Sequence, residues 1–329
     1  MSLAAAAAAF ALRQRQPGCR VAGRLIAGAL ARPLMGAPRT EGEMAPSPFL
    51  DEQLGMLRKS GFDGAAWRVF GAAFWRRAAQ NAAARPDLVR ELRAIRRVGF
   101  LLALAVGFAL RRDGVPVLAE VLLPSLTWLL LCSWVAVELG LVRHPITDAP
   151  SPRIGPANII TLFRGWTAVP ILLIAIYSPR PTITWVALCL LAGVTDLVDG
   201  TVAQRLGQES RLGRLLDPVL DACFFSAAAF SLSRWGLLPG WLAALVTLRY
   251  FAPVVGGLVL LFVLGRSLPV RHTPWGQRST FATSMALFTT WLSTRVPMPP
   301  WLLPALYAVA VINMALALGG ILRRAPRAN

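Results

Sequence analysis

The sequence predicts an all-α membrane protein, in which a core of six transmembrane helices follows amphipathic helices and one or two further membrane helices. Three observations predict this fold class. Of the 329 residues, 56% are hydrophobic and 15% are charged, and the mean hydropathy is +0.56, which is too apolar for an ordinary soluble protein of this length. Apolar stretches of about the length of a membrane span recur along the chain. Arg residues gather in the polar segments between them.

The first segment, residues 1–45, is rich in Ala and Arg and has no acidic residue before Glu41. Its apolar runs are short and are interrupted by Arg, which argues against a secretory signal. We expect either a disordered basic leader or an over-extended start, with Met35 or Met44 as the true first residue.

The second segment, residues 46–150, contains two kinds of helix pattern. Over 46–97, apolar residues recur at roughly helical spacing between arginines, which predicts one or two interfacial amphipathic helices on the cytoplasmic face. Residues 98–110 are apolar but short for a membrane span, whereas residues 115–141 are long enough for one. Together the two segments predict an extra hairpin of membrane helices. A polar, Pro-rich linker at 143–153 marks the boundary with the next domain.

The last segment, residues 151–329, has a regular pattern. Six apolar stretches predict six membrane helices, near residues 156–177, 183–203, 214–233, 237–264, 279–294 and 300–322. Nine arginines fall in alternate loops and the C-terminal tail, against three in the intervening loops, so the 204–214 loop is predicted to face the cytoplasm of a bacterial-type inner or plasma membrane. The net charge of +18 suits anionic lipid better than nucleic acid, because the arginines are scattered between apolar spans.

One stretch of this domain, DLVDGTVAQRLGQESRLGRLLDPVLD, carries Asp196, Asp199, Asp217 and Asp221. Their spacings of three and four place each pair on one helix face, and an antiparallel helix pair would bring both pairs together. Four clustered carboxylates repel each other unless cations are bound. An all-aspartate oxygen set favours magnesium, manganese or calcium, and two such ions suit phosphoryl-group chemistry.

Small residues flank the aspartates. Gly200, Ala203 and Gly213 leave room for a flat or bulky ligand to approach the backbone. A purely structural interpretation is also open, because Asp217 before Pro218 resembles a helix N-cap followed by Pro at the first helical position.

The whole stretch resembles the signature of the CDP-alcohol phosphatidyltransferases, D-x2-D-G-x2-A-R-x8-G-x3-D-x3-D. Seven of its eight specified positions match: Asp196, Asp199, Gly200, Ala203, Gly213, Asp217 and Asp221. At the eighth position Gln204 stands where the family has Arg. The resemblance covers the six-helix half of the chain and leaves residues 1–150 outside.

The resemblance implies an enzyme of phospholipid synthesis. It would transfer a phosphatidyl or related group from a CDP-activated donor, such as CDP-diacylglycerol, to an acceptor hydroxyl and release CMP. Two Mg²⁺ or Mn²⁺ ions would be held on the donor diphosphate by Asp196, Asp199, Asp217 and Asp221. Asp221 would also act as general base on the acceptor, and Gly200, Ala203 and Gly213 would line the cytidine pocket. Relatives are commonly homodimers.

The opening of the first core helix, PANIITLFRGWTAVP, is similar to the family's opening helix. The resemblance implies that Asn158 and Thr161 contact the nucleotide, with Gln204 at the same site, and that Arg164 contacts a phosphate. A structural alternative stays open, in which Asn158 caps the helix and Arg164 reaches the membrane interface.

Two further arginines are candidates for binding the acceptor. Arg249 lies in the middle of an apolar span, where a charge needs a partner, and Arg278 lies at the start of the fifth core helix. Together they favour an anionic acceptor such as a phosphorylated polyol, for example glycerol phosphate. A buried ion pair between helices is the structural alternative for Arg249.

Gln204 keeps two other hypotheses open. Gln cannot supply the fixed charge and planar donor fork of Arg, which raises the possibility of a catalytically weakened relative that binds or scaffolds. A membrane cation carrier that uses the aspartate cluster is the alternative from a different functional class.

Overall fold

The computed structural model describes residues 48–144, 147–206, 210–264 and 274–324, apart from the side chains of 196–206 and of a few residues at helix ends. The predicted leader, residues 1–45, lies outside this description. In the described ranges the regular structure is helical, with one isolated β-bridge between Arg143 and Pro150. The predicted all-α class is confirmed.

The N-terminal part contains four helices in the described ranges: α3 (Pro48–Lys59), α4 (Gly64–Ala84), α5 (Pro86–Leu110) and α6 (Val117–Val137). The pattern had separated an interfacial segment ending at residue 97 from an apolar segment beginning at 98. Instead, α5 runs through both, because no Pro interrupts it after the one at its first position. The Arg-rich half and the apolar half are therefore one continuous helix.

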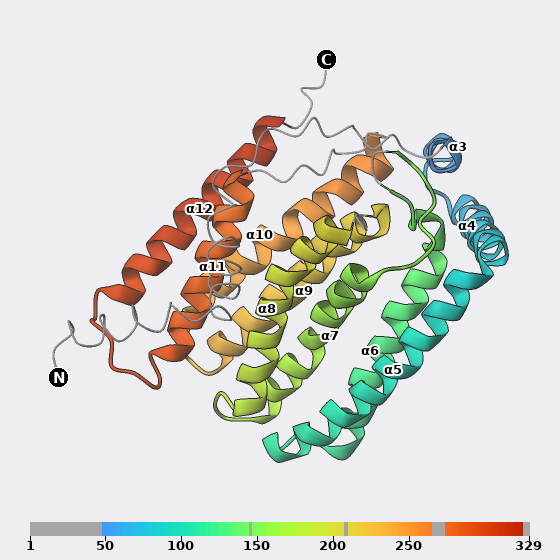
Figure 1. Cartoon of the computed structure of the whole chain (residues 1–329). Helices are drawn as coiled ribbons and strands as arrows, with labels where there is room; N and C mark the ends of the chain where they lie inside the picture. Colours follow the sequence, from blue (N-terminus) through green and yellow to red (C-terminus); the bar gives the residue numbers. More distant parts are fainter. Residues whose placement is uncertain (1–47, 145–146, 207–209, 265–273, 325–329) are drawn as a thin grey trace, which may run out of the picture. The chain divides into compact units, whose positions relative to one another are not determined.

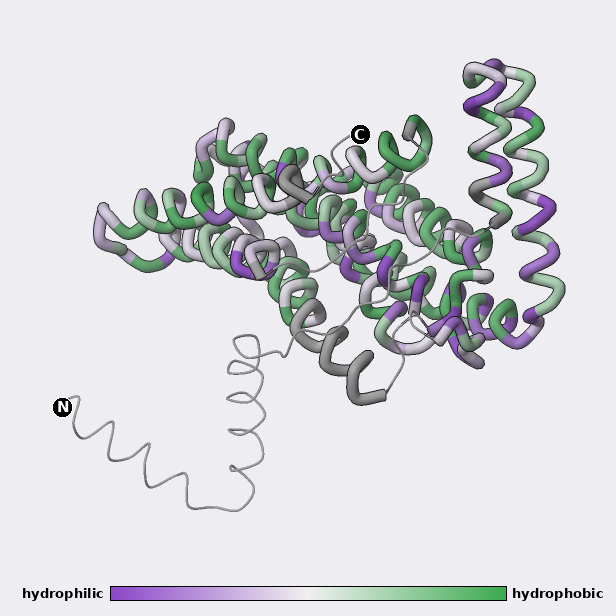
Figure 2. The backbone as a smooth tube through the Cα atoms, turned by 90° about the horizontal axis from the view of Figure 1, so that it is seen from above, coloured by the Kyte–Doolittle hydropathy of each residue, from purple (hydrophilic) through white to green (hydrophobic). Residues whose placement is uncertain are grey.

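The helices α3 and α4 differ in direction from those that follow. Figure 1 shows both nearly end-on, whereas α5 to α12 are seen lengthwise, across the picture. Hydrophobic and hydrophilic residues alternate along them in Figure 2, and Trp67 and Trp75 of α4 are exposed. Exposed tryptophans beside arginines on a helix that runs across the membrane spans are typical of interfacial helices.

An ion pair between a half-exposed arginine and a buried glutamate closes the α5–α6 hairpin. Glu120 of α6 is fully buried, and its Oε1 accepts hydrogen bonds from Nε and Nη2 of Arg111 at 3.1 and 2.9 Å. Trp128 of α6 also donates its indole N–H to the Arg96 carbonyl of α5. Both contacts join the two helices of the hairpin to each other.

The core consists of six helices whose bounds match the predicted spans to within a few residues: α7 (Pro156–Tyr177), α8 (Ile183–Leu206), α9 (Arg211–Arg234), α10 (Gly240–Val259), α11 (Pro274–Leu292) and α12 (Leu302–Arg324). A π-helical turn, Leu260–Leu264, continues α10. In the described residues, α6, α7, α9, α10 with its extension, and α12 are long and apolar enough to cross a membrane, and α8 has a shorter apolar part over Ile183–Thr195. These helices identify an integral membrane protein.

The most buried of these candidate spans is α7, which packs against α6, α8 and α9. Its approach to α9 is close enough to require glycine at position 165. A Cβ atom there would lie 2.7 Å from Leu220 Cβ and 2.4 Å from Leu220 Cδ2. Small residues at helix contacts of this kind let membrane helices pack closely.

Adding one methyl group at Gly165 tests this contact. We expect Gly165→Ala to lower the free energy of unfolding by about 1–3 kcal/mol, since the methyl group overpacks the α7–α9 contact. Gly193→Ala in α8 is the matched control, because nothing lies within 4 Å of its Cβ position and Ala is the better helix former. Thermal unfolding of the purified chain measures both, and equal melting temperatures would contradict the packing argument.

Candidate active site

The site begins at the N-terminal end of α9. Ser210 is its N-cap, and Ser210 Oγ accepts a hydrogen bond from the Gly213 N–H at 3.0 Å. Pro218 lies inside the helix, so the alternative in which Asp217 caps a helix starting at Pro218 is wrong. Asp217 and Asp221 instead lie one turn apart on the same helix, and both are partly exposed.

An ion pair joins α7 to α9 at this site. Arg164 Nη2 lies 2.8 Å from Asp221 Oδ1, and the Arg164 side chain is only 2% exposed, against 26% for Asp221. Arg164 is therefore buried beside the predicted catalytic aspartate and does not reach the membrane interface. The pair holds the Asp221 carboxylate in one orientation while part of it stays accessible.

A second polar contact ties the start of α9 to α7. The Asn158 side chain is buried, and its Nδ2 donates hydrogen bonds to Ser210 Oγ and to the Ile154 carbonyl, the former at 3.0 Å. A Cβ atom at Gly213 would lie 2.7 Å from Asn158 Oδ1, so the small residue there makes room for the Asn158 amide. Asn158 thus has a structural role beside the predicted nucleotide contact. Thr161, one turn further along, is also buried and donates to the Ala157 carbonyl.

Arg249 enters the site from α10. Its Nε donates to Ser279 Oγ at 3.1 Å, and its Nη2 donates to the Gly276 carbonyl at 3.4 Å. Its guanidinium also lies 4.9 Å from the centre of the Tyr250 ring, and the Asp221 carboxylate acts on it electrostatically. The buried Arg249 therefore connects α10 to the start of α11 close to Asp221.

Arg278, the second predicted acceptor residue, is placed differently. It is exposed at the start of α11, with its guanidinium 4.9 Å from the centre of the Trp275 ring. Arg249 contacts the neighbouring Ser279, so both arginines belong to the same end of α11. The structure gives Arg249 a fixed position and leaves Arg278 at the surface.

The remaining predicted residues lie on the last turns of α8, about three in number: Asp196, Asp199, Gly200, Ala203 and Gln204. The helix runs to Leu206, so their backbone is helical as the spacing argument required, but their side chains lie outside the described residues. Elsewhere in the described chain, His, Cys, Asp and Glu form no group of three that could hold a metal ion. The described donors, Asp217 and Asp221, are hard oxygen ligands of the kind that Mg²⁺ and Mn²⁺ prefer, and partial exposure leaves them accessible to such an ion.

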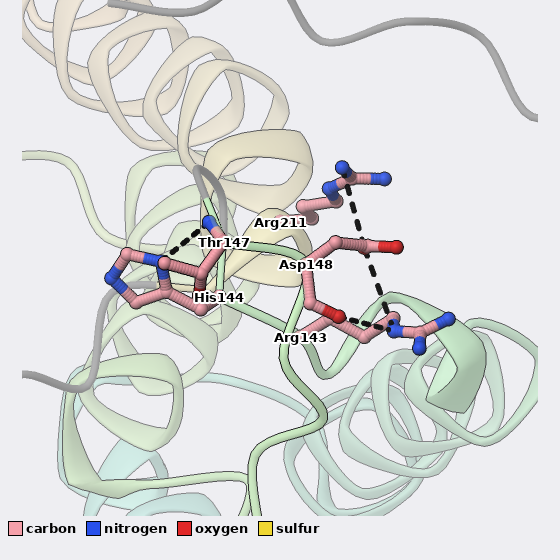
Figure 3. Close-up of polar contacts among 5 residues, drawn as sticks. All are labelled: Arg143, His144, Thr147, Asp148 and Arg211. Atoms are coloured by element: carbon pink, nitrogen blue, oxygen red, sulfur yellow. Dashed lines mark hydrogen bonds and ion pairs between the residues drawn. The ribbon is translucent and has the colours of Figure 1, made fainter.

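The linker before α7 also contacts the start of α9. Figure 3 shows Asp148 between two arginines, with its Oδ1 3.5 Å from Arg143 Nε and 3.3 Å from Arg211 Nη2. The Arg211 N–H donates to the Arg143 carbonyl at 2.9 Å, and His144 Nδ1 accepts from the Thr147 N–H at 3.2 Å. The linker thus holds the first turn of α9, and His144 closes a turn within it.

The sequence indicated the candidate site residues but not the side chains that they contact. The Arg164–Asp221 pair and the Arg249–Ser279 bond each join residues far apart in the chain, and no sequence spacing signals them. Ser210 was detectable, because Ser is a favoured N-cap residue.

The six-helix half of the chain is similar to known proteins. The family model of the CDP-alcohol phosphatidyltransferases matches residues 155–320, just over half of the chain. The CDP-diacylglycerol–glycerol-3-phosphate 3-phosphatidyltransferase of Cereibacter sphaeroides is 31% identical over 139 residues, which are 42% of this chain and 63% of that protein. A putative cardiolipin synthase of Mycobacterium tuberculosis is 33% identical over 125 residues, 38% of this chain and 58% of that protein.

The chain thus spans about 60% of the length of these two relatives. The corresponding glycerol-3-phosphate 3-phosphatidyltransferase of Bacillus subtilis is 34% identical over 100 residues, 30% of this chain and 50% of that protein. No solved structure matches the chain. Since the family model covers the six core helices, apart from the last residues of α12, together with the aspartates of α8 and α9, the chain belongs to the CDP-alcohol phosphatidyltransferase family.

Proposed function

We propose that this chain is a membrane enzyme of phospholipid synthesis that transfers a phosphatidyl or related group from CDP-diacylglycerol, or a similar donor, to an acceptor hydroxyl and releases CMP. Family membership supports the reaction class. The single structural observation that carries the proposal is the arrangement around Asp221, where a partly exposed carboxylate is ion-paired with the buried Arg164.

In this proposal Asp221 accepts the proton of the acceptor hydroxyl as that oxygen attacks the phosphorus atom. The guanidinium of Arg164 keeps the carboxylate pointed in one direction, so that little reorganisation is needed before the proton moves. The partial exposure of Asp221 leaves it accessible to the acceptor. Asn158 and Thr161 on α7, and Gly200, Ala203, Gln204 and Gly213 on α8 and α9, are the proposed surroundings of the donor nucleotide.

The proposed metal ligands are Asp196, Asp199, Asp217 and Asp221. The family is generally dependent on divalent metal ions, and the oxygen donors of these residues suit Mg²⁺ or Mn²⁺. When bound, two such ions would neutralise the charge of the donor diphosphate. Asp217 and Asp221 would contribute from α9, and Asp196 and Asp199 from α8.

The proposed acceptor is an alcohol that carries a phosphate, such as glycerol phosphate. Arg249 supports an anionic acceptor, because it is a buried cation whose position is fixed by Ser279 and Gly276. The two relatives named above as phosphatidyltransferases act, by their names, on glycerol 3-phosphate. Arg278 would add a more solvated positive charge at the same end of α11.

We further propose that the site faces the cytoplasm of a bacterial-type inner or plasma membrane, since arginines are concentrated in the loops on the side of the α8–α9 connection. A homodimer is the assembly that the family resemblance implies. Crosslinking in native membranes tests the dimer, and protease accessibility of the α8–α9 loop in sealed vesicles tests the orientation.

Removing the proposed base should stop the reaction. We expect Asp221→Asn to reduce CMP release from CDP-diacylglycerol at least 100-fold, because the amide cannot accept the hydroxyl proton. Radiolabelled CMP measures the effect, and Asp87→Asn on the surface of α5 is a matched control that should keep full activity. Because Asp221 also neutralises Arg164, Asp217→Asn is a second variant whose effect does not depend on that pair. Full activity in both variants, from folded protein, would refute the proposal.

Arg249 should act on acceptor affinity. We expect Arg249→Gln to raise the KM for glycerol phosphate about tenfold or more, with a smaller change in the KM for the donor, because a charged hydrogen bond contributes roughly 1.5–3 kcal/mol. Arg278→Gln should raise the KM for glycerol phosphate less, since an exposed cation is already solvated. Arg234→Gln, exposed at the far end of α9, should leave both values unchanged. Equal KM values in all three variants would exclude Arg249 from the acceptor site.

Substitution of Gln204 tests the hypothesis that the chain is a catalytically weakened relative of the family. If an Arg at this position supplies charge to the donor diphosphate, Gln204→Arg should raise kcat/KM for CDP-diacylglycerol. Gln204→Ala is the comparison that separates charge from loss of the amide. An unchanged kcat/KM in the Arg variant would indicate that another cation already serves this role.

A further inference from the structure

A cavity of about 270 Å³ lies between α5 and the end of α6, outside the region matched by the family model. Its lining combines two arginines of α5, Arg93 and Arg96, with small or apolar side chains of α6 and the 3-10 turn that follows, among them Cys132, Ala136 and Leu139. The proposed reaction uses none of these residues.

The polar side of the cavity carries positive charge without a compensating acid. Arg93 and Arg96 are three residues apart on α5, and both are exposed. Among the described residues neither arginine forms an ion pair with a carboxylate, and Arg93 Nε donates a hydrogen bond to the Val89 carbonyl of its own helix at 3.4 Å. None of the residues that line the cavity is acidic. The cavity therefore presents two guanidinium groups to a ligand.

The opposite side is apolar and well packed. Cys132 and Leu139 are 1% and 0% exposed, and Leu92 of α5 is 7% exposed. Ala136 is small and leaves the space open between them. A hydrocarbon chain can pack against such a wall without burying a polar group that lacks a hydrogen bond.

The position of the cavity along the helices matches the edge of a membrane. Directly after Arg97, α5 exposes Val98 and Leu101, which are 68% and 65% exposed and suit contact with lipid. The cavity lies just before this apolar half and beside the last turns of the α6 span. The linker that follows α6 is hydrogen-bonded to the first residue of α9, so the cavity is at the same membrane boundary as the start of α9.

We propose that this cavity binds an anionic phospholipid. Its phosphate lies on Arg93 and Arg96, and part of an acyl chain lies against Cys132, Ala136 and Leu139. Charge complementarity selects this occupant, because two unpaired guanidinium groups at a membrane boundary attract a lipid phosphate and an apolar wall below them holds its chain. The site is separate from the aspartates and binds lipid whether or not the chain transfers a phosphatidyl group.

Titration of phosphatidylglycerol into the detergent-solubilised full chain, followed by native mass spectrometry, tests the charged side. Arg93→Gln/Arg96→Gln should weaken binding about ten- to thirtyfold, since each interfacial arginine contributes roughly a factor of five. The matched control is Arg90→Gln/Arg97→Gln, which removes the same charge from the same helix but does not line the cavity. Equal weakening in both double variants would indicate attraction to the surface alone and overturn the proposal.

A second variant tests the apolar side without touching the arginines. Ala136→Trp fills the cavity, so it should also abolish tight binding of phosphatidylglycerol, whereas Asp221→Asn should leave it unchanged. On the unmodified chain, zwitterionic phosphatidylcholine and free glycerol phosphate should each bind at least tenfold more weakly than phosphatidylglycerol. Equal binding of phosphatidylcholine would exclude charge recognition, and loss of binding in Asp221→Asn would place the lipid in the active site. Neither result depends on measured turnover, so a failure here is distinct from a failure of the proposed reaction.

Discussion

Arg164 is a buried cation in the most buried of the candidate membrane helices, and its position depends on the Asp221 carboxylate 2.8 Å away. A charge in such surroundings is expensive unless it is paired, so the pair constrains how α7 and α9 pack. The glycine at 165 adds a steric constraint to the same contact, since only a residue without a Cβ allows Leu220 to approach it. The central helix pair and the candidate site are thus set by the same few residues.

Other polar contacts fix the start of α9 and join α10 to α11. Ser210 caps α9 and binds the Asn158 amide, and Arg249 connects α10 to the start of α11. Asp148 in the linker lies between Arg143 and Arg211, although these side chains are partly exposed, by 22–48%, and ion pairs open to solvent contribute little energy. These contacts together fix the end of α9 that carries the aspartates, which is what a site with positioned carboxylates requires.

The N-terminal helices add a surface that the core does not supply. The fully buried Glu120 is paired with Arg111, which joins α6 to the end of α5. Trp166 of α7 donates its indole N–H to the Pro124 carbonyl, so α6 is attached to the core by a hydrogen bond as well as by packing. The α5–α6 hairpin then places unpaired arginines beside an apolar cavity at the membrane boundary. Lipid binding and phosphatidyl transfer are in this view properties of different parts of one chain.

The sequence is sufficient to predict the membrane class, the six core helices and the aspartate positions, because hydrophobic length and i, i+3 or i, i+4 spacing are local properties. It placed the α5 boundary wrongly, since a change from Arg-rich to apolar residues does not end a helix. The folded structure was needed to show that Arg164 is buried against Asp221 and that Arg249 is held by Ser279. It also gave Gly213 the role of accommodating Asn158. These pairings join segments that are far apart in the chain. Which side chains meet depends on how the helices pack against one another, and the sequence of a single segment does not show that packing.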